Sequence, residues 1–117
     1  MALLTKEEIL GFSDLVTQDI PVPEWNGGSV RISVMPGWAR DEYESLIVAR
    51  GKKGLPPNIR AKYLSYCLVD ESNNLLFTPQ EVELLGKKSS KALDRVFEAA
   101  SNLNATTEEG MLDTAKN

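Results

Sequence analysis

Apolar residues recur along three stretches of the chain at the spacing of one face of an α-helix, and these stretches predict helices near 38–50, 57–69 and 89–103. The expected apolar stripes are Ala39, Tyr43, Leu46 and Ile47, ending in Arg50; Ile59, Tyr63, Tyr66 and Cys67, with Leu64 and Leu68 alongside; and Leu93, Val96, Phe97, Ala100 and Leu103. We expect the first and last of these helices to be the two long ones that carry the core.

Three segments begin with the pattern T-x-x-E, at Thr5, Thr78 and Thr106. In this capping box the threonine and glutamate side chains bind free backbone amides at a helix start. We therefore expect short helices near 5–12, 79–86 and 106–115, with Asn104 at a junction between the last two helices. Gly110 weakens the last one. The expected organisation is one globular domain over residues 1–104 and a weakly helical or frayed tail over 105–117.

Residues 20–34 alternate apolar and polar positions, which predicts an antiparallel β-hairpin at about 16–35. Its apolar residues all have even numbers. Directly paired residues lie on the same face of the sheet, so these residues share one face only if even-numbered residues pair with each other. A three-residue loop at 26–28 satisfies this condition and pairs Val22 with Ile32 and Ile20 with Val34. Because Pro21 and Pro23 lack amide hydrogens, the first strand is expected at the edge of the sheet.

Together these elements predict an α+β fold: a small, mainly helical domain whose single hairpin packs on the helices near 38–50, 57–69, 79–86 and 89–103. Leu75, Leu76 and Phe77 are expected to form a short buried or extended step after the polar turn at 70–74.

The composition narrows the possible functions. The 117 residues include no histidine and one cysteine, Cys67, and the formal net charge is −4. The missing histidines remove the commonest general base and metal ligand. A lone cysteine fits a reducing cytoplasm, and the acidic balance argues against nucleic acid as a partner. The amino terminus does not have the pattern of a signal peptide, and apolar runs are too short to span a membrane.

Motifs for chemistry fail on inspection. Asp70, Ser72, Asn74 and Glu81 occupy calcium-loop positions, but Leu75 replaces the glycine that the loop needs. The carboxylate pairs have no neighbouring nucleophile, so we expect no enzyme, no metal and no cofactor. Basic residues near 50–62 and 87–95 leave a nucleic-acid-binding regulator as a minor alternative.

Two tryptophans remain as candidate contact residues. Trp25 has an odd number and should point away from the valine face of the hairpin, whereas Trp38 begins the following helix. They either pack together, tying hairpin to helix, or contact a partner. The glycines and prolines of residues 51–58 predict a mobile loop. The expected partner-binding residues are Trp25, Trp38, Arg50, Lys52, Lys53 and Leu55.

The order of elements, with "VPEW", "VD…N.LFT" and "LG.KS..ALDRVFEAA..LN" in the sequence, resembles the bacteriophage tail assembly chaperones over residues 5–117. Members of this family are encoded upstream of the tape measure protein in long-tailed phages. The chain departs from the family pattern at "DESNN", where a turn glycine is more usual.

The resemblance implies a non-enzymatic protein that keeps the tape measure protein soluble, helps recruit tail tube subunits and is absent from the mature virion. It implies residence in the host cytoplasm and a companion extended by ribosomal frameshifting. Ala115-Lys116-Asn117 fits this, because GCA AAA AAC contains a slippery heptamer. The alternative is a small structural tail or head-completion protein that stays in the particle.

Overall fold

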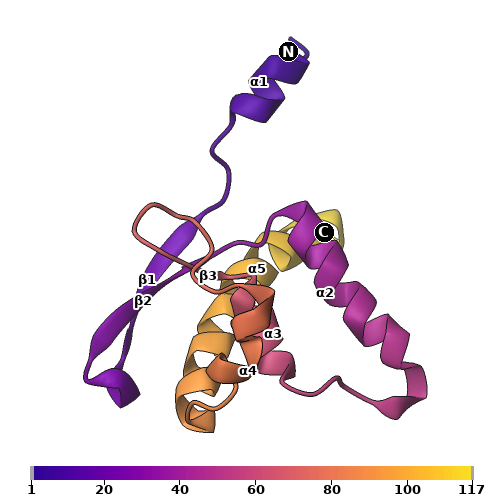
Figure 1. Cartoon of the computed structure of the whole chain (residues 1–117). Coiled ribbons are helices and arrows are strands. Elements are labelled where there is room, and N and C mark those ends of the chain that lie inside the picture. Colours follow the sequence, from indigo (N-terminus) through magenta and orange to yellow (C-terminus); the bar gives the residue numbers. More distant parts are fainter. Residues whose placement is uncertain (1, 117) are drawn as a thin grey trace.

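The structure is a computed structural model that describes the backbone of residues 2–116 and the side chains of residues 2–105. It confirms the α+β class: helices and short 3₁₀ turns (η) surround one three-stranded antiparallel sheet (Figure 1). In chain order the elements are α1 (Lys6–Gly11), β1 (Thr17–Val22), η1 (Pro23–Trp25), β2 (Gly28–Ser33), α2 (Gly37–Arg50), η2 (Gly51–Lys53), α3 (Ile59–Ser65), β3 (Leu68–Val69), η3 (Pro79–Glu81), α4 (Val82–Leu85) and α5 (Ser90–Lys116).

The hairpin forms with the expected parity but with a longer loop. Ile20 pairs with Val30 and Val22 with Gly28, so the predicted partners Val34 and Ile32 are each wrong by four residues. The loop runs from Pro23 to Gly27, because Pro23 starts a 3₁₀ turn instead of continuing the strand. Asn26 and Gly27 close the turn with φ angles of 55° and 71°. Both residue types accept this left-handed conformation at low cost.

As expected, β1 is an edge strand, and β2 is the central strand between β1 and β3. The N–H of Val34 donates to the carbonyl of Val16 at 2.9 Å, so even-numbered residues of β1 direct their backbone polar groups at β2. Pro21 has an odd number, and its nitrogen therefore lies on the outer edge, where a further strand would need an N–H donor.

The strand β3 was not predicted. The helix expected over 57–69 covers only Ile59–Ser65, and Leu68 then pairs with Ile32 of β2. The carbonyl of Cys67 accepts the N–H of Ser33 at 2.8 Å. Pairing with the free edge of β2 satisfies backbone groups that would otherwise be buried unpaired, and this outweighs the helical period of the sequence.

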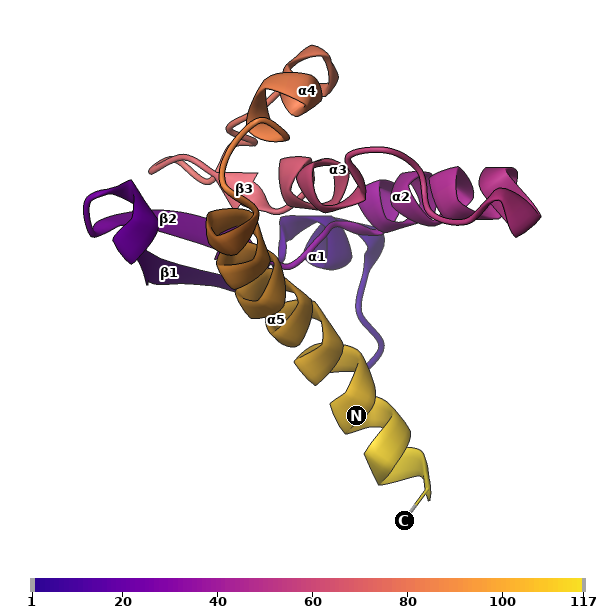
Figure 2. The same ribbon diagram turned by 90° about the horizontal axis from the view of Figure 1, so that it is seen from below.

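The core lies between the sheet, α3 and the first half of α5 (Figure 2). On α5 the predicted face is confirmed: Leu93, Val96 and Ala100 are buried, and Phe97 and Leu103 are partly buried. The helices expected near 89–103 and 106–115 are a single helix, so Asn104 is not at a junction. The capping box expected at Thr106 lies outside the described side chains.

Helix α2 does not carry the core as predicted. Of its expected stripe only Ala39 is buried, whereas Tyr43, Leu46 and Ile47 are half-buried. Figures 1 and 2 show the reason: the hairpin and α2 project to opposite sides of α5. Most of the length of α2 is therefore not covered by the sheet.

Both predicted capping boxes within the described side chains are present. Thr5 and Glu8 cap α1 with bonds of 3.0 and 3.2 Å, and the Thr78 N–H donates to Glu81 at 2.8 Å before η3 and α4. Helix α1 buries no residue and stands apart from the rest of the molecule (Figure 1). Within the described part of the chain, no helix combines the length and the apolarity that crossing a membrane requires.

Candidate functional site

A mainly apolar hollow of about 300 Å³ lies between α2, α3, α4 and the segment 75–79, and we call it the α2 groove. Its apolar walls are formed by Trp38, Leu46, Tyr66, Leu75, Phe77 and Val82. Glu42 and Lys62 supply opposite charges to its lining. The volume is at the lower end of ligand clefts and suits a few inserted side chains.

Aromatic side chains hold α2 against α3 beside this groove. Trp38 and Tyr66 meet edge to face with ring centroids 6.2 Å apart, and Tyr43 meets Tyr66 at 6.4 Å and Tyr63 at 5.1 Å. Tyr63 in turn contacts Phe97 of α5 at 4.8 Å. Such tilted pairs contribute about 0.5–1.5 kcal/mol each beyond the area that they bury. The position of α2 therefore depends on a row of aromatic contacts.

The tyrosine hydroxyls in this row stay protonated. Burial raises the pKa of Tyr63 to about 12. Burial also raises the pKa of Tyr66, and the nearby Glu42 carboxylate, to which the hydroxyl hydrogen-bonds, raises it further. The hydroxyls can act as hydrogen-bond donors but not as bases at neutral pH. This row of side chains therefore suits contact with another protein segment better than proton transfer.

A second hollow of about 260 Å³ lies between α2 and α5, lined by Met35, Tyr43, Ile47, Tyr63 and Asn104 among others. Residues 38, 42 and 46 face the α2 groove, whereas residues 43 and 47 face this second hollow. Helix α2 is thus an apolar wall between two hollows, which explains why its stripe is only half-buried.

The two tryptophans lie apart and make different contacts. Trp25 is part of η1 and packs, half-buried, against the core, so the prediction that it points away from the valine face is wrong. The parity of a strand does not continue into a 3₁₀ turn. Next to it, Glu24 holds Arg95 of α5 through two bonds of 2.9 and 3.0 Å. Among the described ring contacts, Trp38 meets Tyr66 and not Trp25.

The other expected partner-binding residues lie at the far end of α2. Arg50 ends the helix and donates to the carbonyl of Lys53 at 3.4 Å, while its Nε is buried without a hydrogen-bond partner among the described atoms. Lys52 and Lys53 belong to η2, and Leu55 is 63% exposed. The structure brings these four together but leaves Trp25 and Trp38 elsewhere. Their partner-binding role stays a prediction.

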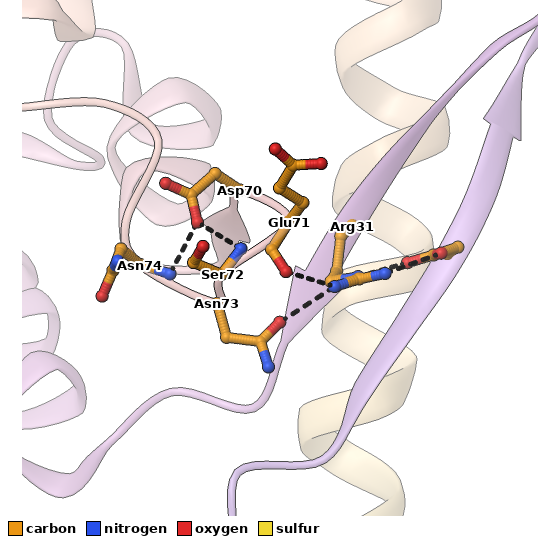
Figure 3. A network of polar contacts seen from close by, with 7 residues as sticks. Arg31, Asp70, Glu71, Ser72, Asn73 and Asn74 are labelled. Atoms are coloured by element: carbon orange, nitrogen blue, oxygen red, sulfur yellow. Dashed lines mark hydrogen bonds and ion pairs between the residues drawn. The ribbon is translucent and has the colours of Figure 1, made fainter.

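The polar turn at 70–74 is tied to the sheet by Arg31, a residue that the sequence did not single out (Figure 3). The Asp70 carboxylate accepts the N–H groups of Ser72 and Asn74 at 2.8 and 3.0 Å. Arg31 donates to the Glu71 carbonyl and to Asn73 Oδ1 at 3.2 and 3.1 Å.

The same turn explains why "DESNN" does not need the turn glycine that is more usual at this place. Asn73 has φ of 65° and takes the left-handed position that a glycine usually fills. Among the described side chains, no three histidine, cysteine, aspartate or glutamate residues are placed to hold a metal ion.

Cys67 is fully buried between α3 and β3. Burial raises the pKa of its thiol to about 12, although the nearby Asn104 amide acts in the opposite direction. The thiol is therefore protonated at neutral pH and cannot act as a nucleophile.

The sequence did not anticipate the α2 groove. Tyr66 was placed on a core face, and Leu75 and Leu76 were expected to be buried or extended. The N–H of Leu76 does donate to the Leu68 carbonyl at 3.0 Å beside β3, but the two leucines are 41% and 49% exposed. No local pattern separates an apolar residue of the core from one that lines an open groove.

No protein-family model and no curated protein matches this sequence. The solved structures do give a match, and they show the fold of a bacteriophage tail assembly chaperone. The match is the structure of the bacteriophage HK97 tail assembly chaperone, with a TM-score of 0.60 and 17% sequence identity, over 80% of this chain and 88% of that chain. This likeness of fold agrees with the family resemblance that the sequence shows.

Proposed function

We propose that this protein is a phage tail assembly chaperone that binds the tape measure protein, keeps it soluble and helps recruit tail tube subunits. The observation that carries the proposal is the fold shared with the HK97 tail assembly chaperone over most of both chains. The family resemblance of the sequence also supports the proposal, because the order of its elements and segments such as "VPEW" are similar to those of the family. The proposed role is non-enzymatic and belongs to the host cytoplasm.

Helix α2 is the best candidate for client contact. It projects from the body, separates two apolar hollows and presents Trp38, which is 58% exposed. Its far end carries Arg50, Lys52 and Lys53 beside the exposed Leu55. A long helical client with an apolar stripe and acidic flanks would find both apolar and basic groups along this surface.

Co-expression with the tape measure protein tests the proposal. We expect the soluble fraction of the tape measure protein to rise when the chaperone is present, and Trp38→Ala to reduce that rise. The matched control is Leu84→Ala, because Leu84 is also 58% exposed but lies on α4 and does not line the α2 groove. An equally insoluble tape measure protein with and without this chain would overturn the function.

Mass spectrometry of purified virions separates the chaperone from a structural tail or head-completion protein. The proposed chaperone is absent from the mature particle, whereas a structural protein is found there in fixed copy number. Binding to DNA that is lost at high salt would instead indicate a nucleic-acid-binding regulator.

A companion extended by frameshifting is also part of the proposal. The codons of Ala115, Lys116 and Asn117 decide whether a slippery heptamer exists there. We expect a longer product in infected cells that shares the peptides of this chain, and synonymous recoding of these three residues should abolish it. A gene without any slip site near this position would contradict this part of the proposal.

A further inference from the structure

Residues 2–16 form an arm in which every residue is exposed. Helix α1 buries nothing, and a stretch at 12–16 connects it to β1 (Figure 1). We call residues 2–16 the N-terminal arm. Its large apolar side chains are between 46% and 94% exposed: Leu3, Leu4, Ile9, Leu10, Phe12, Leu15 and Val16.

An isolated helix as short as α1 is marginal in water. It has 6 residues, while helices below about 12–15 residues depend on tertiary contacts for their stability. A capping box satisfies its first amides but supplies no apolar contact. A capped, apolar segment of this kind is typical of one that becomes stable when it docks on another surface.

The arm is attached to the sheet beside the segment that leads into α2. The bond from the Val34 N–H to the Val16 carbonyl places the base of the arm beside the end of β2. Val34 itself is only four residues before Trp38. The stretch from Leu10 to Val16 spans up to about 20 Å when extended. This length is available for the movement of Ile9, Leu10 and Phe12 about Val16 without any change in the sheet.

The arm and the groove each carry charges of both signs. The first turn of α1 has Glu7 and Glu8 beside Lys6. The lining of the α2 groove includes Lys62 and Glu42. Because the two surfaces are joined through a short tether, their effective concentration is high, and a weak contact suffices for docking.

We propose that the N-terminal arm is a tethered strap that docks in the α2 groove of its own chain. Docking inserts apolar side chains of the arm between Trp38, Tyr66 and Leu75, and the open arm in the structure is the released form. Where a client uses the same groove, the arm competes with it for Trp38.

Crosslinking within one chain tests this without any client, so its outcome is independent of the chaperone function. Leu10→Cys combined with Leu75→Cys places one thiol on the arm and one at the groove, both at exposed positions. The matched control pairs Leu10→Cys with Leu84→Cys on α4. The native Cys67 is buried and stays unreactive. We expect a short bismaleimide to join 10 to 75 within the chain about tenfold faster than 10 to 84.

Three results decide the proposal. The rate should be independent of protein concentration, and Phe12→Asp should lower it several-fold, whereas Ser13→Asp should leave it unchanged. Circular dichroism of both variants confirms that the body is folded. Equal rates for the two cysteine pairs would overturn the proposal. Covalent dimers that increase with concentration would also overturn it, because the arm would then dock on a second copy.

Discussion

The side-chain oxygen of Asn104, on α5, accepts a hydrogen bond from the backbone N–H of Met35 at 2.9 Å. The amide nitrogen of the same side chain donates to the Ala100 carbonyl, also at 2.9 Å. Asn104 therefore joins the exit of the hairpin to α5 at the point where the chain turns into α2. The bond fixes the backbone of Met35, two residues before α2 begins, against α5.

Replacing Asn104 should lower the free energy of unfolding, because its side chain is the hydrogen-bond partner of the Met35 N–H. Asn104→Ala leaves the Met35 N–H without its partner, and an unsatisfied buried group costs about 1–3 kcal/mol. Urea denaturation measures the free energy of unfolding. Glu98→Ala, at an exposed position of the same helix, should change it by less than about 0.5 kcal/mol. Equal effects of the two substitutions would show that the Met35 contact contributes nothing.

The ion pair between Arg31 and Asp19 should make stability depend on pH. Its bonds are 2.7 and 3.2 Å long, and Arg31 holds the pKa of the Asp19 carboxyl below its usual value. A lowered pKa in the folded state means that the contribution is present above the ordinary aspartate pKa and is lost as the pH falls through the folded value.

We therefore expect Asp19→Asn to lower the melting temperature at neutral pH. The difference from the native chain should shrink as the pH falls below the ordinary aspartate pKa and should vanish once the native carboxyl is protonated at its lowered pKa. Thermal melts across this range provide the measurement. A difference that stays constant down to the lowest pH would contradict the assignment.

Leu64 is the clearest test of where the core lies. It is fully buried on α3, and truncation of a buried leucine to alanine costs about 2–5 kcal/mol. We expect Leu64→Ala to lower the free energy of unfolding by an amount in this range. Leu84→Ala removes the same atoms from an exposed side chain and should have little effect. The two variants compared in urea distinguish burial from side-chain type.

Two glycines, Gly27 in the hairpin loop and Gly37 at the start of α2, have opposite expectations on replacement by alanine. Gly27 has φ of 71°, where an alanine is strained, so Gly27→Ala should destabilise the protein by about 1–2 kcal/mol. Gly37 begins α2 with open space around it, and Gly37→Ala should be neutral or stabilising. Thermal melts report both signs. A destabilising Gly37→Ala and a neutral Gly27→Ala would contradict the loop conformation.

Cys67 should resist thiol reagents in the folded protein. Its pKa of about 12 keeps it protonated, and its side chain is fully buried. At about pH 8 an ordinary cysteine is partly ionised and reacts readily. We expect Cys67 to react with a maleimide only after denaturation, as followed by mass spectrometry. Rapid labelling of the native protein would show that α3 and β3 open easily.

The elements that the sequence predicts well depend on interactions within a few residues. The capping boxes at Thr5 and Thr78 form because each threonine and its glutamate are three positions apart. The apolar face of α5 is buried as expected because the period of a helix brings Leu93, Val96 and Ala100 to one side. The even parity of the hairpin also holds, since alternation is a property of the strand itself.

The candidate site was only partly predictable. Trp38 and the basic end of α2 were expected from exposed aromatic and charged residues, but their use by a partner stays a prediction. The groove walls Tyr66, Leu75 and Phe77 were not anticipated, because they come together from separate elements. The same holds for Arg31, whose partners Asp19 and Asn73 lie far from it in the sequence.

The sequence alone determined the class of fold, the starts of the capped helices and the apolar side of α5, because backbone geometry relates neighbouring residues directly. The tertiary structure decided the pairing of β3 with β2, the loop from Pro23 to Gly27 and the exposure of α2 and of the N-terminal arm. These features depend on which surface remains free to cover an apolar stripe or to pair a strand edge. That is settled only when elements distant in the sequence pack together.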